Sequence, residues 1–242
     1  MSKLKSIHTS RTLMFDELEK VMDFAIGNGN FMEALKQNVT GKKSNSGVEK
    51  TKEYLKKLYS FDTDYPLFNA LKYFWKVSDE KDKPRLALCY AISHDYLLAE
   101  SISVIFDTNQ GEKVTVGKLE NNIETHNPNK YSANTRKSIA QNIASSWKQA
   151  GFIEGKVKNI RVQPEISYNV ACFAFLLAWL RGDKGDFIWN NIGVRALCQS
   201  ESKLRNLAID CAKRDLMQYQ YAGSVTAISF NLLLNKIGID GI

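Results

Sequence analysis

The spacing of the apolar residues constrains this 242-residue chain most, because they recur every three or four positions through most of its length. This spacing is typical of α-helices with one buried face. Only two stretches, 152–164 and 218–234, alternate apolar and other residues as β-hairpins do. We therefore predict a mainly α fold, a helical bundle with winged-helix or helix-turn-helix-like units and short β-hairpins. Helices are expected over residues 10–26, 31–39, 48–61, 66–75, 84–106 with a break near His94–Asp95, 115–123, 132–150, 187–197 and 201–215.

The order of these elements divides the chain into three parts. Residues 1–110 form an N-terminal helical domain with a basic helix-turn-helix-like segment, and residues 111–166 form a winged-helix-like unit. Residues 167–242 form a C-terminal helical unit that has room for the second hairpin. Serines at three predicted helix starts, Ser10, Ser132 and Ser200, are good N-caps.

Positive charge points to an anionic partner. The chain has 33 lysines and arginines against 26 acidic residues, a net charge of +7 and a pI of about 9.1. Residues 36–57 alone hold seven lysines and two glutamates. Two other interpretations stay open, namely that lysines only keep the protein soluble and that those at 36–57 form a solvated helix face.

Between Glu124 and Glu154 the chain has no acidic residue. On a helical wheel the helix over 132–150 has an apolar side that contains Ile139, Ile143 and Trp147, and this side should face a core. Amide, hydroxyl and lysine side chains lie on the opposite side. A basic hairpin follows this helix. The resulting order is that of a winged helix: a helix, a turn, a helix with a polar face, and a hairpin.

The polar face and the hairpin are suited to double-stranded DNA. Glutamine and asparagine can bond adenine edges, whereas lysine and arginine neutralise phosphates. Docking of another protein is the alternative use of such a unit. The residues expected to contact DNA here are Arg136, Lys137, Gln141, Asn142, Ser145, Lys148, Lys156, Lys158 and Arg161.

The C-terminal unit repeats this order of elements with a different charge pattern. Its second helix, 201–215, mixes basic and acidic residues, among them Lys203, Arg205, Glu201 and Asp210. Docking is the favoured use of this unit, although its sequence shows no repeat of the earlier one.

Motifs for catalysis or cofactors are missing from the sequence. It has no Gly-rich phosphate loop, no HExxH and no GxSxG, and its three histidines and four cysteines are scattered. We therefore expect no enzyme activity, no metal and no cofactor, with a nuclease built from scattered carboxylates as the remaining alternative. The N-terminus lacks the features of a signal peptide, and the most apolar run, 170–180, is too short to span a bilayer. A cytoplasmic protein is expected.

Two segments carry a resemblance to a known family. NVTGKKSNSGVEKTKEYLKKLY (38–59) resembles the early basic helix-turn-helix segment of the BrxA family of BREX bacteriophage-exclusion systems, and YSANTRKSIAQNIASSWKQAGFIEG (131–155) resembles its later helix and hairpin. The resemblance covers approximately residues 10–165. The long extension after residue 165 departs from the family pattern, and so does the absence of a segment long enough for the inner-membrane location given to some members.

The resemblance implies a non-enzymatic, mostly helical protein that binds DNA and is partly similar in fold to the antitermination factor NusB. It assigns DNA contact to Lys137, Gln141 and Lys148 in the later helix and, in the early segment, to Lys42, Lys43, Ser44 and Lys50. The expected role is a DNA-binding accessory protein of a BREX-like defence system, with other defence proteins as further partners. A docking scaffold and a winged-helix transcriptional regulator are the alternatives, and the oligomeric state is left open.

Overall fold

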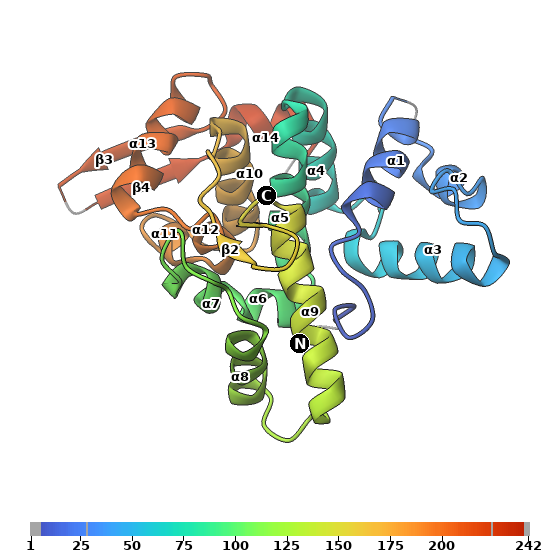
Figure 1. The fold of residues 1–242 in the computed structure, drawn as a ribbon. Helices are drawn as coiled ribbons and strands as arrows, with labels where there is room; N and C mark the ends of the chain where they lie inside the picture. The colour runs from blue at the N-terminus through green and yellow to red at the C-terminus, as the bar shows by residue number, and fades with distance from the viewer. Residues whose placement is uncertain (1–5, 28, 224, 240–242) are drawn as a thin grey trace.

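A computed structural model describes residues 6–27, 29–223 and 225–239 of the chain (Figure 1). The fold is mainly helical with two short antiparallel β-hairpins, as the sequence predicts. The elements are α1 (Phe15–Ala25), α2 (Phe31–Lys36), α3 (Asn45–Tyr59), α4 (Pro66–Val77), a 3-10 turn η1 (Glu80–Asp82), α5 (Lys83–Ile92), α6 (Tyr96–Glu100), α7 (Ile102–Asp107), α8 (Val116–His126), α9 (Ala133–Gln149), β1 (Ile153–Glu154), β2 (Ile160–Arg161), α10 (Tyr168–Leu180), α11 (Phe187–Asn190), α12 (Ile192–Arg195), α13 (Glu201–Ala212), β3 (Gln218–Ala222), β4 (Val225–Ser229) and α14 (Asn231–Ile237).

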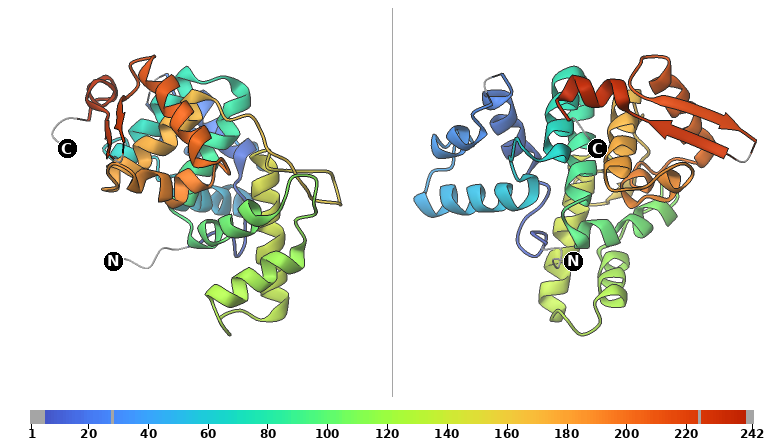
Figure 2. Two further views of the ribbon diagram at one scale, coloured as in Figure 1. Left: turned by 90° about the vertical axis from the view of Figure 1, so that its left-hand side faces the viewer. Right: turned by 180° about the vertical axis from the view of Figure 1, so that it is seen from behind.

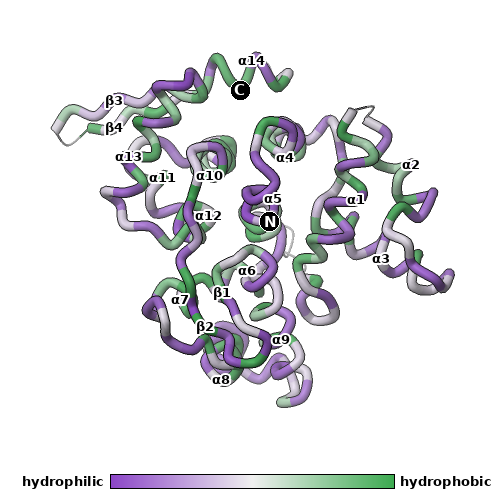
Figure 3. Tube along the Cα trace, turned by 45° about the horizontal axis from the view of Figure 1, so that its top comes forward, coloured by the Kyte–Doolittle hydropathy of each residue, from purple (hydrophilic) through white to green (hydrophobic). Residues whose placement is uncertain are grey.

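Two central helices, α5 and α10, are buried on nearly all sides. α10 packs against α4, α5, α12 and α13, and its residues from Asn169 to Trp179 are all buried. Its trace is almost continuously hydrophobic (Figure 3). At 13 residues α10 is about 20 Å long, well short of the hydrocarbon core of a bilayer. Within the described residues, no helix combines the length and hydrophobicity that crossing a membrane requires.

The N-terminal helices α1, α2 and α3 form a lobe at one side of this core (Figure 1). The prediction that Ser10 caps the first helix is wrong, because α1 begins only at Phe15. Residues 6–14, here called the strap, instead run along α6 and α9 and bond to both. The third helix starts three residues earlier than predicted, since the Ser44 hydroxyl accepts a hydrogen bond from Gly47 N–H and caps α3.

Several predicted helix boundaries are confirmed. The break near His94–Asp95 separates α5 from α6, and the Asp95 carboxylate caps α6. Ser132 and Ser200 cap α9 and α13. Gly151, at a φ of 82° that favours glycine, ends α9. The helix predicted over 187–197 is instead two short helices, α11 and α12, because the Asn191 side chain accepts a hydrogen bond from Gly193 N–H and starts a new turn.

Candidate nucleic-acid interface

Residues 111–161, here called the winged unit, have the connectivity of a winged helix. Before α8, residues 112–114 run beside β2, where Arg161 N–H donates to Glu112 O and Val114 N–H donates to Asn159 O, both at 2.8 Å. α8 and α9 then pack against each other, and β1–β2 follows α9 with Ile153 opposite Arg161. The α8–α9 corner projects from the lower end of the molecule (Figure 1). The second helix of such a unit is the one that enters a DNA groove.

The apolar side of α9 is buried as the wheel predicts. Ile139, Ile143 and Trp147 are fully enclosed, and the Trp147 indole N–H donates to the Ser101 hydroxyl at 2.8 Å. On the far side Lys137 and Gln141 are exposed, and Ser145 and Lys148 are half-buried. These four side chains follow one another along a single line of the helix, since they are spaced four, four and three residues apart.

Arg136 belongs to the edge of this helix and already has an acidic partner. Its guanidinium forms an ion pair with the Glu124 carboxylate of α8. The acid-free stretch therefore contributes fewer free cations than its sequence suggests. Lys137 forms no ion pair with any residue that the structure describes, so Lys137 is a stronger candidate than Arg136 for a phosphate contact.

The strap covers one margin of the polar face of α9. Asn142 Nδ2 donates to the His8 carbonyl at 2.9 Å, and Gln149 Nε2 donates to the Thr12 hydroxyl at 3.0 Å. The expectation that the Asn142 amide faces DNA bases is wrong, because this amide holds the strap. The wheel assigns a side chain to a polar side but does not show which other segment packs there.

The tip of the β1–β2 hairpin is exposed and basic. Lys156 and Lys158 reach solvent on either side of Val157, which is 86% exposed. Neither lysine has a partner among the described side chains. The hairpin therefore presents two free ammonium groups on the same unit as α9.

Arg161 lies inside the same hairpin. Its side chain is buried, with Nε donating to Ile105 O at 2.9 Å and Nη2 donating to Gln163 Oε1 at 2.7 Å. The expectation that Arg161 points to solvent with the hairpin lysines is wrong. It pairs with Ile153 across the hairpin, and both side chains turn toward the interior.

The early basic segment lies at the start of α3. Lys43 and Lys50 are exposed, and Ser44 is the α3 cap. Lys42 is partly neutralised, because its Nζ lies 2.6 Å from the Glu17 carboxylate of α1. The backbone of Lys42 is held in place by both ends of the Asn38 side-chain amide.

A cleft of about 300 Å³ joins the two regions that the sequence singles out separately. Lys42 and Gly47 line one wall, and Asn142 of α9 lines the other. Arg11 of the strap also reaches this cleft, where its guanidinium lies 4.9 Å from the centre of the Tyr54 ring. Tertiary structure thus places the early basic segment next to the winged unit, although about 90 residues separate them in sequence.

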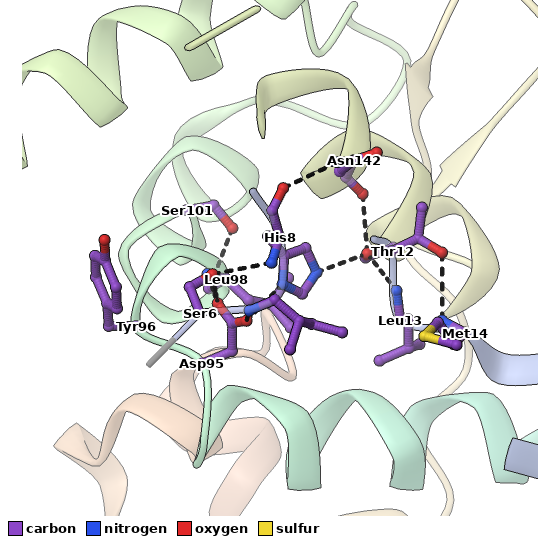
Figure 4. Close-up of polar contacts among 12 residues, drawn as sticks. Ser6, His8, Thr12, Leu13, Met14, Asp95, Tyr96, Leu98, Ser101 and Asn142 are labelled. Atoms are coloured by element: carbon purple, nitrogen blue, oxygen red, sulfur yellow. Dashed lines mark hydrogen bonds and ion pairs between the residues drawn. The ribbon is translucent and has the colours of Figure 1, made fainter. Parts of the chain in front are cut away.

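A buried polar cluster that no sequence pattern indicates lies where the strap meets α6 and α9 (Figure 4). His8 Nδ1 lies 2.8 Å from Asp95 Oδ2, in ion-pair rather than hydrogen-bond geometry, and His8 Nε2 lies 2.9 Å from Ser146 Oγ. Asp95 also accepts from Ser6 Oγ and Ile7 N–H, both at 2.7 Å. No sequence signal could have found this cluster, because His8, Asp95 and Ser146 are isolated in the chain.

Serine, histidine and aspartate in this order suggest a hydrolase, but the surroundings favour a structural role. All three residues are fully buried. Ser146 Oγ donates to Asn142 O at 2.9 Å and accepts from Leu13 N–H at 2.8 Å, so the hydroxyl has no free direction for a substrate. Burial raises the pKa of Asp95, but attraction to His8 and the hydrogen bonds to the carboxylate outweigh it and hold the pKa below its ordinary value.

Comparisons with known proteins give no relative for this chain: no family model, curated protein or solved structure matches it. Among the residues that the structure describes, no three histidine, cysteine or acidic side chains gather as metal ligands would. The geometry of the winged unit and of the cleft is therefore the basis for assigning a function.

Proposed function

We propose that this chain is a cytoplasmic, non-enzymatic protein that binds duplex DNA through its winged unit. The observation that carries the proposal is the line of exposed Lys137, exposed Gln141 and half-buried Lys148 on α9, together with the basic hairpin tip. Residues 125–153, which include all of α9, contain no acidic residue, so α9 has no carboxylate that would repel phosphates.

The side chains divide into two roles. Lys137, Lys148, Lys156 and Lys158 neutralise phosphates and release counterions, which provides most of the affinity. Gln141 is an exposed amide near the middle of the helix that can bond a base edge in the major groove. Asn142 is occupied by the strap, so few amides of α9 can bond bases and sequence preference is limited.

The cleft beside α9 extends the same surface. Arg11 and Lys42 line the cleft opposite Asn142 of α9, and Lys43 and Lys50 of the same basic segment are exposed. A duplex seated on α9 can meet these cations with a neighbouring stretch of its backbone. The part that the protein takes in a BREX-like defence system rests on the sequence resemblance alone.

A salt titration tests the proposal. Log affinity should fall with log salt concentration by about 0.9 per phosphate contact, so Lys137→Ala, Lys156→Ala and Lys158→Ala should each lower the slope by about one unit on any duplex. Lys203→Ala on α13 is the matched control, because it removes an exposed lysine from the other unit. If the wild type shows no binding at low salt, or if Lys203→Ala changes the slope as much as the three test variants do, the proposal fails.

Gln141→Ala separates base contact from phosphate contact. This variant should keep the wild-type slope and change the preference between two unrelated duplexes by about 1 to 3 kcal/mol if Gln141 bonds a base. An equal loss on both duplexes would show that Gln141 contacts only the backbone.

Docking of other proteins is the second candidate function, and a specific observation favours it for the C-terminal unit. Three large hydrophobic residues of this unit are more than half exposed, namely Phe187, Tyr221 and Val225. Charged residues are depleted and aromatic residues enriched at the centres of protein interfaces. The two functions belong to different parts of the chain and do not exclude each other.

A further inference from the structure

The β3–β4 hairpin projects from the rest of the molecule (Figure 2, right) and has one closed edge and one open edge. Trp179 Nε1 donates to Ile228 O at 3.2 Å on the outer side of β4. Gly185 also lies against that side, since a Cβ added there would lie 2.9 Å from Thr226 O. α10 and the segment after it therefore close the edge of β4.

The backbone groups of β3 have no such cover. Tyr219 is opposite Ile228, and Tyr221 is opposite Thr226. Ile228 O bonds outward to Trp179, so the Tyr219–Ile228 pair makes no backbone hydrogen bonds across the hairpin. Hydrogen-bonded and non-bonded pairs alternate in an antiparallel ladder, so the Tyr221–Thr226 pair is also non-bonded. Tyr219 and Tyr221 thus direct their own N–H and C=O groups to the open side. Over the described chain, no backbone bond from outside the hairpin reaches β3.

The open edge also lacks the features by which proteins prevent pairing. Lysine, proline and β-bulges usually protect an edge strand. Residues 216–235 contain neither a charged side chain nor a proline, and β3 pairs with β4 in unbroken register. Gln220, Tyr221 and Ala222 are exposed, with Tyr221 at 54%. This strand is built to pair with another strand.

We propose that β3 pairs antiparallel with β3 of a second copy of this chain, which joins two hairpins into a four-stranded sheet. In a two-fold contact, a residue on the axis lies opposite the same residue of the second copy. A charged residue there would therefore face a like charge. β3 has the sequence QYQYA, which fits itself in this way. Gln220 lies on the axis opposite its own copy, and Tyr219 lies opposite Tyr221 of the second copy.

This register satisfies the free backbone groups. Tyr219 and Tyr221, which direct their N–H and C=O groups outward, become the hydrogen-bonded pairs, and the two Gln220 residues become a non-bonded pair with Cα atoms about 4.5 Å apart. Tyrosines opposite each other on one face form favourable cross-strand pairs. The contact does not depend on DNA binding, so its tests are made without DNA.

Sedimentation velocity over a range of protein concentrations tests the pairing. The wild type should associate to a dimer, and Gln220→Lys should weaken association at least tenfold because it places two ammonium groups opposite each other. Ala227→Lys is the matched control, since Ala227 is the exposed partner of Gln220 on β4 and lies one strand further from the axis. A wild type that stays monomeric at the highest concentration, or a Gln220→Lys variant that dimerises like the wild type, overturns the proposal.

Cysteine cross-linking tests the register. Mild oxidation should join Gln220→Cys into a covalent dimer, because non-bonded antiparallel pairs bring side chains closest together. Both variants carry Cys198→Ser, because Cys198 is half-buried whereas Cys89, Cys172 and Cys211 are buried. Ala227→Cys should stay uncrosslinked, as should the Cys198→Ser parent. Equal cross-linking of the two variants overturns the predicted register. Circular dichroism of every variant shows that a negative result does not come from unfolding.

Discussion

In the winged unit, residues 112–114 run beside β2, and α8, α9 and a hairpin follow. In the C-terminal unit, residues 168–237, the segment around Gly185 lies beside β4, and α11, α12, α13 and a hairpin belong to the same unit. The two hairpins nevertheless expose different chemistry. The tip of the first carries Lys156 and Lys158, whereas the second is free of charge.

Each hairpin is attached to its unit by a tryptophan that packs against a phenylalanine at the hairpin base. Trp147 meets Phe152 edge to face with ring centres 5.2 Å apart, and Trp179 meets Phe230 in the same manner at 5.9 Å. The two hairpins are thus anchored by the same kind of aromatic contact, whereas their exposed side chains differ. Similar backbone arrangements can support DNA contact in one place and protein contact in another, because the exposed side chains decide which partner is attracted.

Replacing the two anchors should have the largest effect. Trp147→Ala should lower the free energy of unfolding by about 3 to 5 kcal/mol, as large-to-small changes of fully buried aromatic residues do. Trp179→Ala should cost less, because Trp179 keeps 9% of its surface exposed. Urea denaturation of both variants, with the corresponding tryptophan-to-phenylalanine variants as controls, measures the difference. A larger loss at Trp179 would mean that the C-terminal hairpin is the better anchored one.

The strap distinguishes the winged unit further, since His8 fastens it both to Ser146 of α9 and to Asp95 at the start of α6. Asp95→Asn should lower stability by about 3 kcal/mol, because it breaks a fully buried pair and weakens the carboxylate's hydrogen bonds to Ser6 and Ile7. Asp186→Asn is the matched control in the C-terminal unit, and its effect should be small because the Asp186 carboxylate is half exposed. Equal losses would contradict the assignment of Asp95 as the fastening point.

The pH dependence of stability gives the same contact a second test. The pKa of Asp95 lies below its ordinary value of 3.8 in the folded chain, so the unfolded chain takes up this proton first as the pH falls. The contribution of Asp95 is present above that ordinary value and is lost as the pH falls through the lower folded pKa. Asp95→Asn should therefore flatten the acid side of a stability–pH curve. A variant curve parallel to the wild type would show that other carboxylates set the acid limit.

Arg161 and Lys158 lie in one hairpin and should respond in opposite ways. Arg161→Ala leaves the Ile105 carbonyl and the Gln163 side chain without their buried donor and should cost about 1 to 3 kcal/mol of stability. It should leave the salt slope of DNA binding unchanged in the folded protein. Lys158→Ala should change the slope and spare the melting temperature. A lowered slope in Arg161→Ala at full folding would place Arg161 among the DNA contacts after all.

The helix caps should show the smallest effect and the closest agreement between the units. Ser132 accepts from Thr135 N–H at the start of α9, and Ser200 accepts from Lys203 N–H at the start of α13, both at 3.3 Å. Ser132→Ala and Ser200→Ala should each cost about 1 kcal/mol in thermal or chemical denaturation. A clear difference between them would show that one cap also holds a neighbouring element.

Local pattern predicted the helices well where the determinant lies within a few residues. The caps Ser132 and Ser200, the terminating Gly151 and the buried side of α9 all follow from neighbours in sequence. Strand faces were less predictable. β2 has only two residues, so its alternation cannot show that Arg161 faces inward while the nearby lysines face solvent.

The candidate site was predictable in part for the same reason. The sequence marks Lys137, Gln141, Lys156 and Lys158, which the structure leaves exposed. It could not show that Asn142 holds the strap or that Arg136 pairs with Glu124, because each of these contacts joins segments that only packing brings together.

By itself, the sequence determines the helical character of this protein, the caps of its main helices and the position of its acid-free and charge-free stretches. Tertiary structure decides which polar side chains of those stretches remain free. It buries His8 against Asp95 and Ser146, closes the edge of β4 with Trp179, and leaves the edge of β3 open. The physical reason is that helix formation depends on bonds between residues four apart, whereas the burial of a side chain or a strand edge depends on segments far away in the chain.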